Sequence, residues 1–175
     1  SNFSVDLLRT AEQALGPGRV VSNQIKYSLF DHEFADEVIP YCRDNDIALL
    51  HDAAYSEVGY DGYQAASMMQ LEGGKEAGLE FHSLSKTYNM TGWRIGMAVG
   101  NADMIKALFQ IKANLDSGIP QAVQEMAMEA LTGPQDCVAE NVATYKWRRD
   151  RVIQALTVMG LKVEVPRASL YVWAP

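Results

Sequence analysis

Cysteine is scarce in this sequence, with only Cys42 and Cys137 among 175 residues. They stand far apart, each within a helical pattern, so we expect free, buried thiols and neither a disulfide nor a metal pair. Long apolar runs are missing too, because none approaches the roughly 20 residues that cross a bilayer. No basic segment followed by an apolar one opens the chain. We therefore expect no membrane partner, no metal site and a cytoplasmic location.

Positive charge is also low. Fifteen Lys and Arg residues stand against 22 Asp and Glu residues, which gives a formal net charge of -7, and no basic cluster stands out. We expect no nucleic-acid partner, since such a partner needs local positive charge to replace its phosphate counterions. The composition, 48% hydrophobic and 21% charged, is that of a globular chain with its own core and excludes disorder.

Helical and strand patterns alternate along the chain, which favours an α/β fold of three layers with a largely parallel sheet. The expected helices cover residues 5–15, 33–45, 103–113, 120–131 and 135–159. The expected strands cover residues 20–25, 47–50, 80–83 and 95–100. A C-terminal hairpin is expected from residues 161–165 and 169–173.

Residues 20–50 are expected to form a right-handed βαβ unit. Asp31 is placed to cap its helix, and Pro40 is expected to bend or shorten that helix because proline cannot donate a backbone hydrogen bond. Residues 61–78, rich in Gly, Met, Gln and Ala, are expected to form a long connection with one or two helical turns.

The most informative segment is residues 82–96, which read HSLSKTYNMTGWRIG. Lys86 has Ser at the first and third positions before it, and Thr-Gly-Trp-Arg ends eight residues after it. An ordinary surface lysine between two strands is the alternative. The combination closely resembles the cofactor-lysine motif of class I/II, fold-type I pyridoxal-phosphate aminotransferases. It is nearest to the LL-diaminopimelate aminotransferase subgroup.

A second segment carries the same resemblance. Residues 51–58, HDAAYSEV, begin at the carboxyl end of the expected strand 47–50, the edge at which open α/β sheets bind ligands. Asp52 and Tyr55 match the Asp-x-x-Tyr pattern of the family, and Lys86 follows Asp52 by 34 residues, a separation of the family's size. Alone, an acidic residue at a strand end is more often a helix cap or a turn former.

The resemblance implies pyridoxal 5'-phosphate as the cofactor and gives six residues roles in binding it. Lys86 would form the Schiff base and later act as the general base, Asp52 would keep the ring nitrogen protonated, and Tyr55 would donate to the 3-oxygen. These three form the expected catalytic set. Hydroxyl groups and one guanidinium would hold the phosphate, and they come from Ser83, Ser85 and Arg94.

The N-terminal residues resemble a different family. Residues 1–8, 20–31 and 37–43 are similar to aldo-keto reductases, which are TIM barrels that hold the nicotinamide with a Ser-Asn pair and a Gln. Ser1, Asn2 and Gln24 match that set. We therefore expect a chimeric chain of three parts: a βαβ piece of a barrel, a partial aminotransferase large domain, and the truncated start of a small domain. Their expected bounds are 1–46, 47–160 and 161–175.

Three functions are compatible with these patterns. The first is transfer of an amino group between an amino acid and a 2-oxo acid, impaired by truncation, in a homodimer such as the parent family forms. The second is a non-catalytic chimeric scaffold. The third is a reductase remnant that binds a nicotinamide cofactor, although the sequence lacks the catalytic residues of that family.

Overall fold

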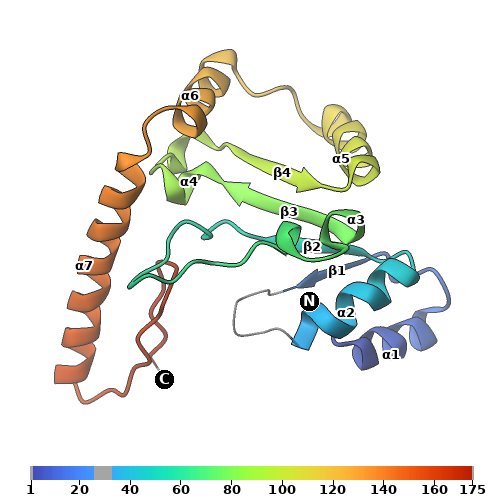
Figure 1. The fold of residues 1–175 in the computed structure, drawn as a ribbon, viewed down its shortest axis with the longest axis horizontal. Helices are drawn as coiled ribbons and strands as arrows, with labels where there is room; N and C mark the ends of the chain where they lie inside the picture. The colour runs from blue at the N-terminus through green and yellow to red at the C-terminus, as the bar shows by residue number, and fades with distance from the viewer. Residues whose placement is uncertain (1, 26–32, 175) are drawn as a thin grey trace. The chain divides into compact units, whose positions relative to one another are not determined.

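The computed structural model describes residues 2–25 and 33–174 (Figure 1). They divide into two compact units. The first unit contains the residues up to Ala53 together with Ala66–His82 and Met97–Gly118. The second unit contains Ala54–Ala65, Ser83–Gly96 and the residues from Ile119 onwards. Among the described residues, no helix is both long enough and apolar enough to cross a membrane.

Four strands form one sheet, in the order β1 (Ser22–Ile25), β2 (Ala48–Asp52), β3 (Gly78–Ser83) and β4 (Gly96–Gly100). β1, β2 and β3 are parallel. β4 runs antiparallel to β3, because the Leu84 N–H donates to the Ile95 carbonyl and the Asn101 N–H donates to the Gly78 carbonyl. The opposed arrows of β3 and β4 are visible in Figure 1. The sheet is therefore mixed, and the predicted parallel arrangement is confirmed only for its first three strands.

The connection between β3 and β4, residues 84–95, contains no long helix, and this explains the reversal. It holds two separate turns, the one-turn helix α4 (Leu84–Thr87) and the 3-10 turn η2 (Thr91–Trp93). A parallel return needs a crossover of a dozen or more residues, usually with a helix long enough to pass over the sheet. Two isolated turns cannot provide such a crossover, so β4 returns alongside β3.

The remaining elements of the first unit are α1 (Val5–Leu15), α2 (Glu33–Asp44), the 3-10 turn η1 (Met68–Gln70), α3 (Gly74–Ala77) and α5 (Ala102–Leu115). The Ser4 side chain caps α1 by accepting from the Leu7 N–H, and Gly16 follows the helix with a φ of 95°. The two turns η1 and α3 lie in the connection where one or two helical turns were predicted. Asp31, the expected cap of α2, lies outside the described residues.

Pro40 does not end its helix, because α2 continues to Asp44. Of the two effects predicted for this proline, shortening of α2 is therefore wrong, and bending of the helix stays a prediction. The physical reason is that Val38, Ile39 and Cys42 lie on both sides of Pro40 and are buried in the core. The core of this unit is an apolar cluster made by Leu8, Ile25, Val38, Ile39, Cys42, Ile47, Leu49, Met68 and Ala77.

The two cysteines are both free, as predicted, but their surroundings differ. Cys42 is buried, and this burial, together with the charge of Glu12, raises the pKa of its thiol to about 11. Cys137 is exposed, so the expectation of a buried thiol is wrong there. It lies in the first turn of α7, where the side chain does not enter a core.

The second unit contains α4, η2, α6 (Gln121–Thr132) and α7 (Asp136–Val158). α7 confirms the single long helix predicted for residues 135–159. Arg149 is the buried residue of this helix. Its guanidinium donates to the carboxylates of Asp61 and Asp150 and to the Pro166 carbonyl, and it lies 4.6 Å from the centre of the Tyr60 ring. One side chain thus ties α7 to two loop segments.

The predicted C-terminal hairpin does not form, since residues 161–174 contain no strand. The backbone of this segment pairs with an earlier loop instead. The Tyr60 N–H donates to the Arg167 carbonyl, and the Ser169 N–H donates to the Val58 carbonyl. The Tyr60 hydroxyl also donates to the Ser169 carbonyl at 2.6 Å. These backbone groups are therefore taken by residues 58–60 rather than by a second arm of a hairpin.

Candidate active site

Lys86 lies in α4, the single helical turn that follows β3. The Ser83 side chain caps this turn by accepting from the Ser85 N–H at 3.2 Å. Leu84 and Ser85 are buried and Lys86 is half-buried. The Lys86 Nζ lies 5.9 Å from the centre of the Tyr55 ring. The structure therefore brings together two of the three predicted catalytic residues within the second unit.

Tyr55 has a second aromatic neighbour that the motifs did not indicate. Its hydroxyl donates to the Tyr171 hydroxyl at 3.1 Å, and the two rings meet edge to face with their centres 5.8 Å apart. Tyr171 also lines a cavity of about 250 Å³ together with Tyr60, Tyr145 and Arg148. The C-terminal segment thus contributes directly to the surroundings of Tyr55.

The predicted phosphate-binding residues belong to one loop, residues 83–94. Thr91 organises it, because its hydroxyl donates to the Ser85 carbonyl at 3.1 Å and its carbonyl accepts from the Arg94 Nη1 at 3.1 Å. Arg94 is exposed and has a left-handed backbone with a φ of 53°. Within residues 2–25 and 33–174, no carboxylate lies at ion-pair distance from this guanidinium. Its remaining N–H groups and the two serine hydroxyls are chemically suited to an anion such as phosphate.

Asp52 is the last residue of β2 and belongs to the first unit. It is exposed and stands opposite Phe81 in the β2–β3 register. The Ala53 N–H donates to the Phe81 carbonyl at 2.8 Å and continues the ladder by one bond. Asp52 thus lies at the carboxyl end of a parallel strand, as predicted. Its pairing with the cofactor ring stays a prediction.

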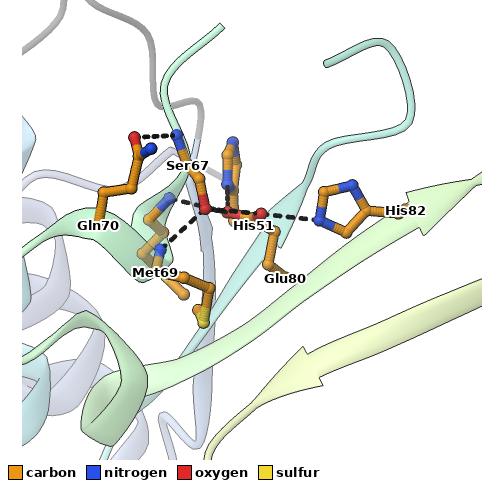
Figure 2. Close-up of polar contacts among 7 residues, drawn as sticks. His51, Ser67, Met69, Gln70, Glu80 and His82 are labelled. Carbon is orange, nitrogen blue, oxygen red and sulfur yellow. Dashed lines mark hydrogen bonds and ion pairs between the residues drawn. The ribbon is translucent and has the colours of Figure 1, made fainter. Parts of the chain in front are cut away.

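Beside Asp52 lies a buried polar cluster that the motifs did not indicate. Its centre is the Glu80 carboxylate in β3, which is 1% exposed. Figure 2 shows His51 and His82 on this carboxylate, with Ser67 and the turn that follows it close by. A charged residue in a short buried strand was the available signal, because acidic residues are depleted from strands. Among the described residues, no group of three or more His, Cys, Asp or Glu is arranged to hold a metal ion.

Two imidazoles, one hydroxyl and one backbone N–H contact the Glu80 carboxylate. His51 Nδ1 and His82 Nε2 each lie 2.8 Å from one of its oxygens. The Ser67 hydroxyl lies 2.9 and 3.0 Å from the two oxygens, and the Met68 N–H lies at 2.8 Å. Burial alone would raise the pKa of the Glu80 carboxyl, but the hydrogen bonds from His51, Ser67 and Met68 outweigh it and lower the pKa to about 2.

The fold and the lysine-bearing loop together define a class of enzymes. The sequence profile of "Aminotransferase class I and II" matches residues 28–175. The chain therefore belongs to the class I and II aminotransferases, whose cofactor is pyridoxal 5'-phosphate. The residues around Lys86 fit that group, since a half-buried amine, an aromatic ring and several N–H and O–H donors lie in one unit.

Among curated proteins, LL-diaminopimelate aminotransferases are similar to this chain. The LL-diaminopimelate aminotransferase of Dehalococcoides mccartyi is 55% identical over 143 residues, which are 82% of this chain and 37% of that protein. The enzyme of the same name from Moorella thermoacetica is 52% identical over 145 residues, 83% of this chain and 37% of that protein. The chain thus spans about 37% of the length of these curated relatives.

Solved structures show the same likeness. The aspartate aminotransferase of Rhizobium meliloti has a TM-score of 0.78 and 32% sequence identity, covering 95% of this chain and 44% of that chain. An aminotransferase from Staphylococcus aureus has a TM-score of 0.75 and 32% identity, covering 87% of this chain and 42% of that chain. The aminotransferase-like α/β fold is therefore established for this chain.

The resemblance of the N-terminal part to aldo-keto reductases receives no support. The family match already begins at residue 28, and the Rhizobium structure covers 95% of the chain. β1 pairs with β2 in the sheet that also holds β3 and β4, and a TIM-barrel piece is not confirmed. Of the residues expected to hold a nicotinamide, Asn2 donates its N–H to the Gln24 carbonyl at 2.7 Å, and Ser1 lies outside the described residues. The domain bounds at 46 and 160 stay predictions.

Proposed function

We propose that this chain carries the lysine-bearing half of a pyridoxal-phosphate site that transfers an amino group between an amino acid and a 2-oxo acid. The observation that carries the proposal is the placement of Lys86 in its capped turn, with Nζ 5.9 Å from the centre of the Tyr55 ring. The family match supports the reaction class. The 55% identity to an LL-diaminopimelate aminotransferase favours a diamino dicarboxylic acid as the substrate.

Each predicted residue has a chemical task in this proposal. When bound, the cofactor supplies an aldehyde that captures amino groups and a ring that stores the electron pair left on Cα. The Lys86 amine would hold the cofactor through its aldehyde and would later take up the proton removed from Cα. The Tyr55 hydroxyl, which donates to the Tyr171 hydroxyl in the structure, would turn to donate to the 3-oxygen of the cofactor, and Asp52 would keep the ring nitrogen protonated. The hydroxyls of Ser83 and Ser85 and the guanidinium of Arg94 would hold the phosphate.

The whole enzyme would act as a cytoplasmic homodimer of the kind expected for the family. Because the chain spans about 37% of its curated relatives, we propose that this stretch binds cofactor more readily than it turns substrate over. Cofactor binding is therefore the property to measure first.

Titration of the purified chain with pyridoxal 5'-phosphate tests the proposal. We expect saturable uptake, seen as a visible absorbance band that survives dialysis, and loss of that band in Lys86→Ala. Lys75→Ala is the matched control, because Lys75 is an exposed lysine in α3 and its loss leaves the band unchanged. An equal band in the wild type and in Lys86→Ala would refute the role of Lys86.

A further inference from the structure

The Glu80 carboxylate is a buried charge for which the proposed chemistry has no use. Its side chain is 2% exposed, and that of His51, its partner across the sheet, is 6% exposed. A buried charge is costly unless hydrogen bonds compensate for it. This buried charge lies close to Asp52. In the β2–β3 register, Glu80 stands opposite His51, and the next pair along the strands is Phe81 and Asp52.

Every neighbour of the carboxylate acts as a donor. The Ser67 hydroxyl and the Met68 N–H donate to it. An ionised carboxylate only accepts, so each imidazole must present an N–H. His51 therefore carries a proton on Nδ1 and His82 carries one on Nε2. With Glu80 ionised, all of these hydrogen bonds are satisfied when both imidazoles donate to the carboxylate.

These bonds join three elements at one end of the sheet. Glu80 and His82 lie on the same face of β3, and His51 lies in β2. Ser67 is the N-cap of η1, and Met68 is the first residue of that turn. We propose that Glu80 is a positioning residue that fixes the carboxyl end of β2 and with it Asp52. The inference rests on the proposed function in one respect, which is the role of Asp52 at the ring nitrogen of the cofactor.

Strand ends open more easily than strand centres, which is why such a residue is useful at this place. Beyond Asp52, the ladder to β3 continues through the bond from the Ala53 N–H to the Phe81 carbonyl. Glu80 lies one residue before Phe81, so loss of its bonds to β2 and η1 frees this end first. The other end of β2 is held separately, by the bond from the Ala48 N–H to the Val21 carbonyl.

Amide hydrogen exchange of the cofactor-free chain, followed residue by residue by NMR, tests the proposal in Glu80→Gln. We expect exchange of the Ala53 amide to accelerate by about tenfold or more, as the loss of hydrogen bonds to a charged group implies, while the Ala48 amide changes less than about threefold. Glu72→Gln is the matched control, since Glu72 is exposed. Equal acceleration at both amides, or none at Ala53, would overturn the proposal.

The imidazole groups give an independent readout that a general loss of stability would not move. The Gln side chain presents an NH2 group where the carboxylate only accepted, so one histidine must present a bare nitrogen to it. We expect the imidazole nitrogen shifts of His51 or His82 to report a changed tautomer in Glu80→Gln and none in Glu72→Gln. Unchanged shifts of both histidines in Glu80→Gln would contradict the donor arrangement.

Ser67→Ala is the second variant in case Glu80→Gln does not fold. It removes one donor and keeps the charge, and we expect the same preference for Ala53 over Ala48 at about threefold or more. Equal changes at the two amides would again overturn the inference. A wild-type chain that takes up no pyridoxal phosphate would refute the proposed function, whereas the exchange comparison would still decide the role of Glu80.

Discussion

Lys86 stands on a short, well-fixed piece of backbone. Leu84 and Ser85 in the same turn are buried, and Ser83 caps the turn, so the lysine stem starts from a defined position. The serines and the Thr-Gly-Trp-Arg residues that mark this loop are neighbours along the chain. Their spacing could therefore be recognised in the sequence. Thr91 links them in the structure, because its hydroxyl donates to the Ser85 carbonyl and its own carbonyl accepts from Arg94.

The Glu80 cluster was not readable in this way. His51, Ser67 and Glu80 come from three separate segments, and only the β2–β3 register together with turn η1 brings them into contact. Nothing in the local spacing distinguishes His51 from a residue facing solvent, because a shift of one residue would turn its side chain to the other face. The same dependence on distant contacts hides the Tyr55–Tyr171 pair, which spans 116 residues.

The depressed pKa of Glu80 predicts a pH dependence of stability. The ordinary value of 4.5 applies to the unfolded chain and a value of about 2 to the folded one. The contribution of this carboxylate to stability is thus complete above pH 4.5 and is lost as the pH falls toward 2. Its full size is on the order of 3 kcal/mol, at about 1.4 kcal/mol per pKa unit.

Urea unfolding of the wild type and of Glu80→Gln between pH 3 and pH 7 measures this contribution. We expect the difference in free energy of unfolding to shrink by about 1.4 kcal/mol per pH unit as the pH falls below 4.5. Subtracting the two proteins removes the effect of the other carboxylates. A difference that stays constant down to pH 3 would show that Glu80 does not ionise as described.

At the scale of elements, helix ends were the most predictable feature and strand partners the least. Ser4 and Gly16 mark the ends of α1 through local capping, which depends on adjacent residues alone. The direction of β4 and the fate of residues 161–174 depend instead on which backbone groups are already taken. Val58 and Tyr60 bond to the backbone groups of Ser169 and Arg167, and no pattern within the C-terminal segment indicates this.

Arg149 is the element-scale contact with the clearest energetic prediction. Arg149→Met keeps an unbranched apolar stem but removes the donors to Asp61 and to the Pro166 carbonyl. We expect the free energy of unfolding to fall by about 2 kcal/mol, the range for hydrogen bonds that involve a charged group. Urea unfolding measures it, with Arg151→Met as the control because Arg151 is exposed on the same helix. Equal effects of the two substitutions would contradict the bridging role of Arg149.

At the scale of the whole chain, the α/β class followed from the alternation of helical and strand patterns, and the family from the lysine motif. The aldo-keto reductase resemblance failed because its matching residues, Asn2 and Gln24 among them, carry no spacing that is specific to one fold. The net charge of -7 leaves phosphate binding to local donors, which is why the loop around Arg94 matters more than the overall charge. The proposal that this chain binds pyridoxal phosphate therefore depends on that loop and on Lys86.

The most direct measurement is reduction of the cofactor-treated chain with borohydride, followed by peptide mapping. We predict that the reduced cofactor is attached to the peptide that contains Lys86, in an amount close to one per chain, and that the Lys75 peptide is unmodified. Labelling spread over the exposed lysines, or absent from Lys86 at saturating cofactor, would contradict the assignment of this chain as the lysine-bearing half of the site.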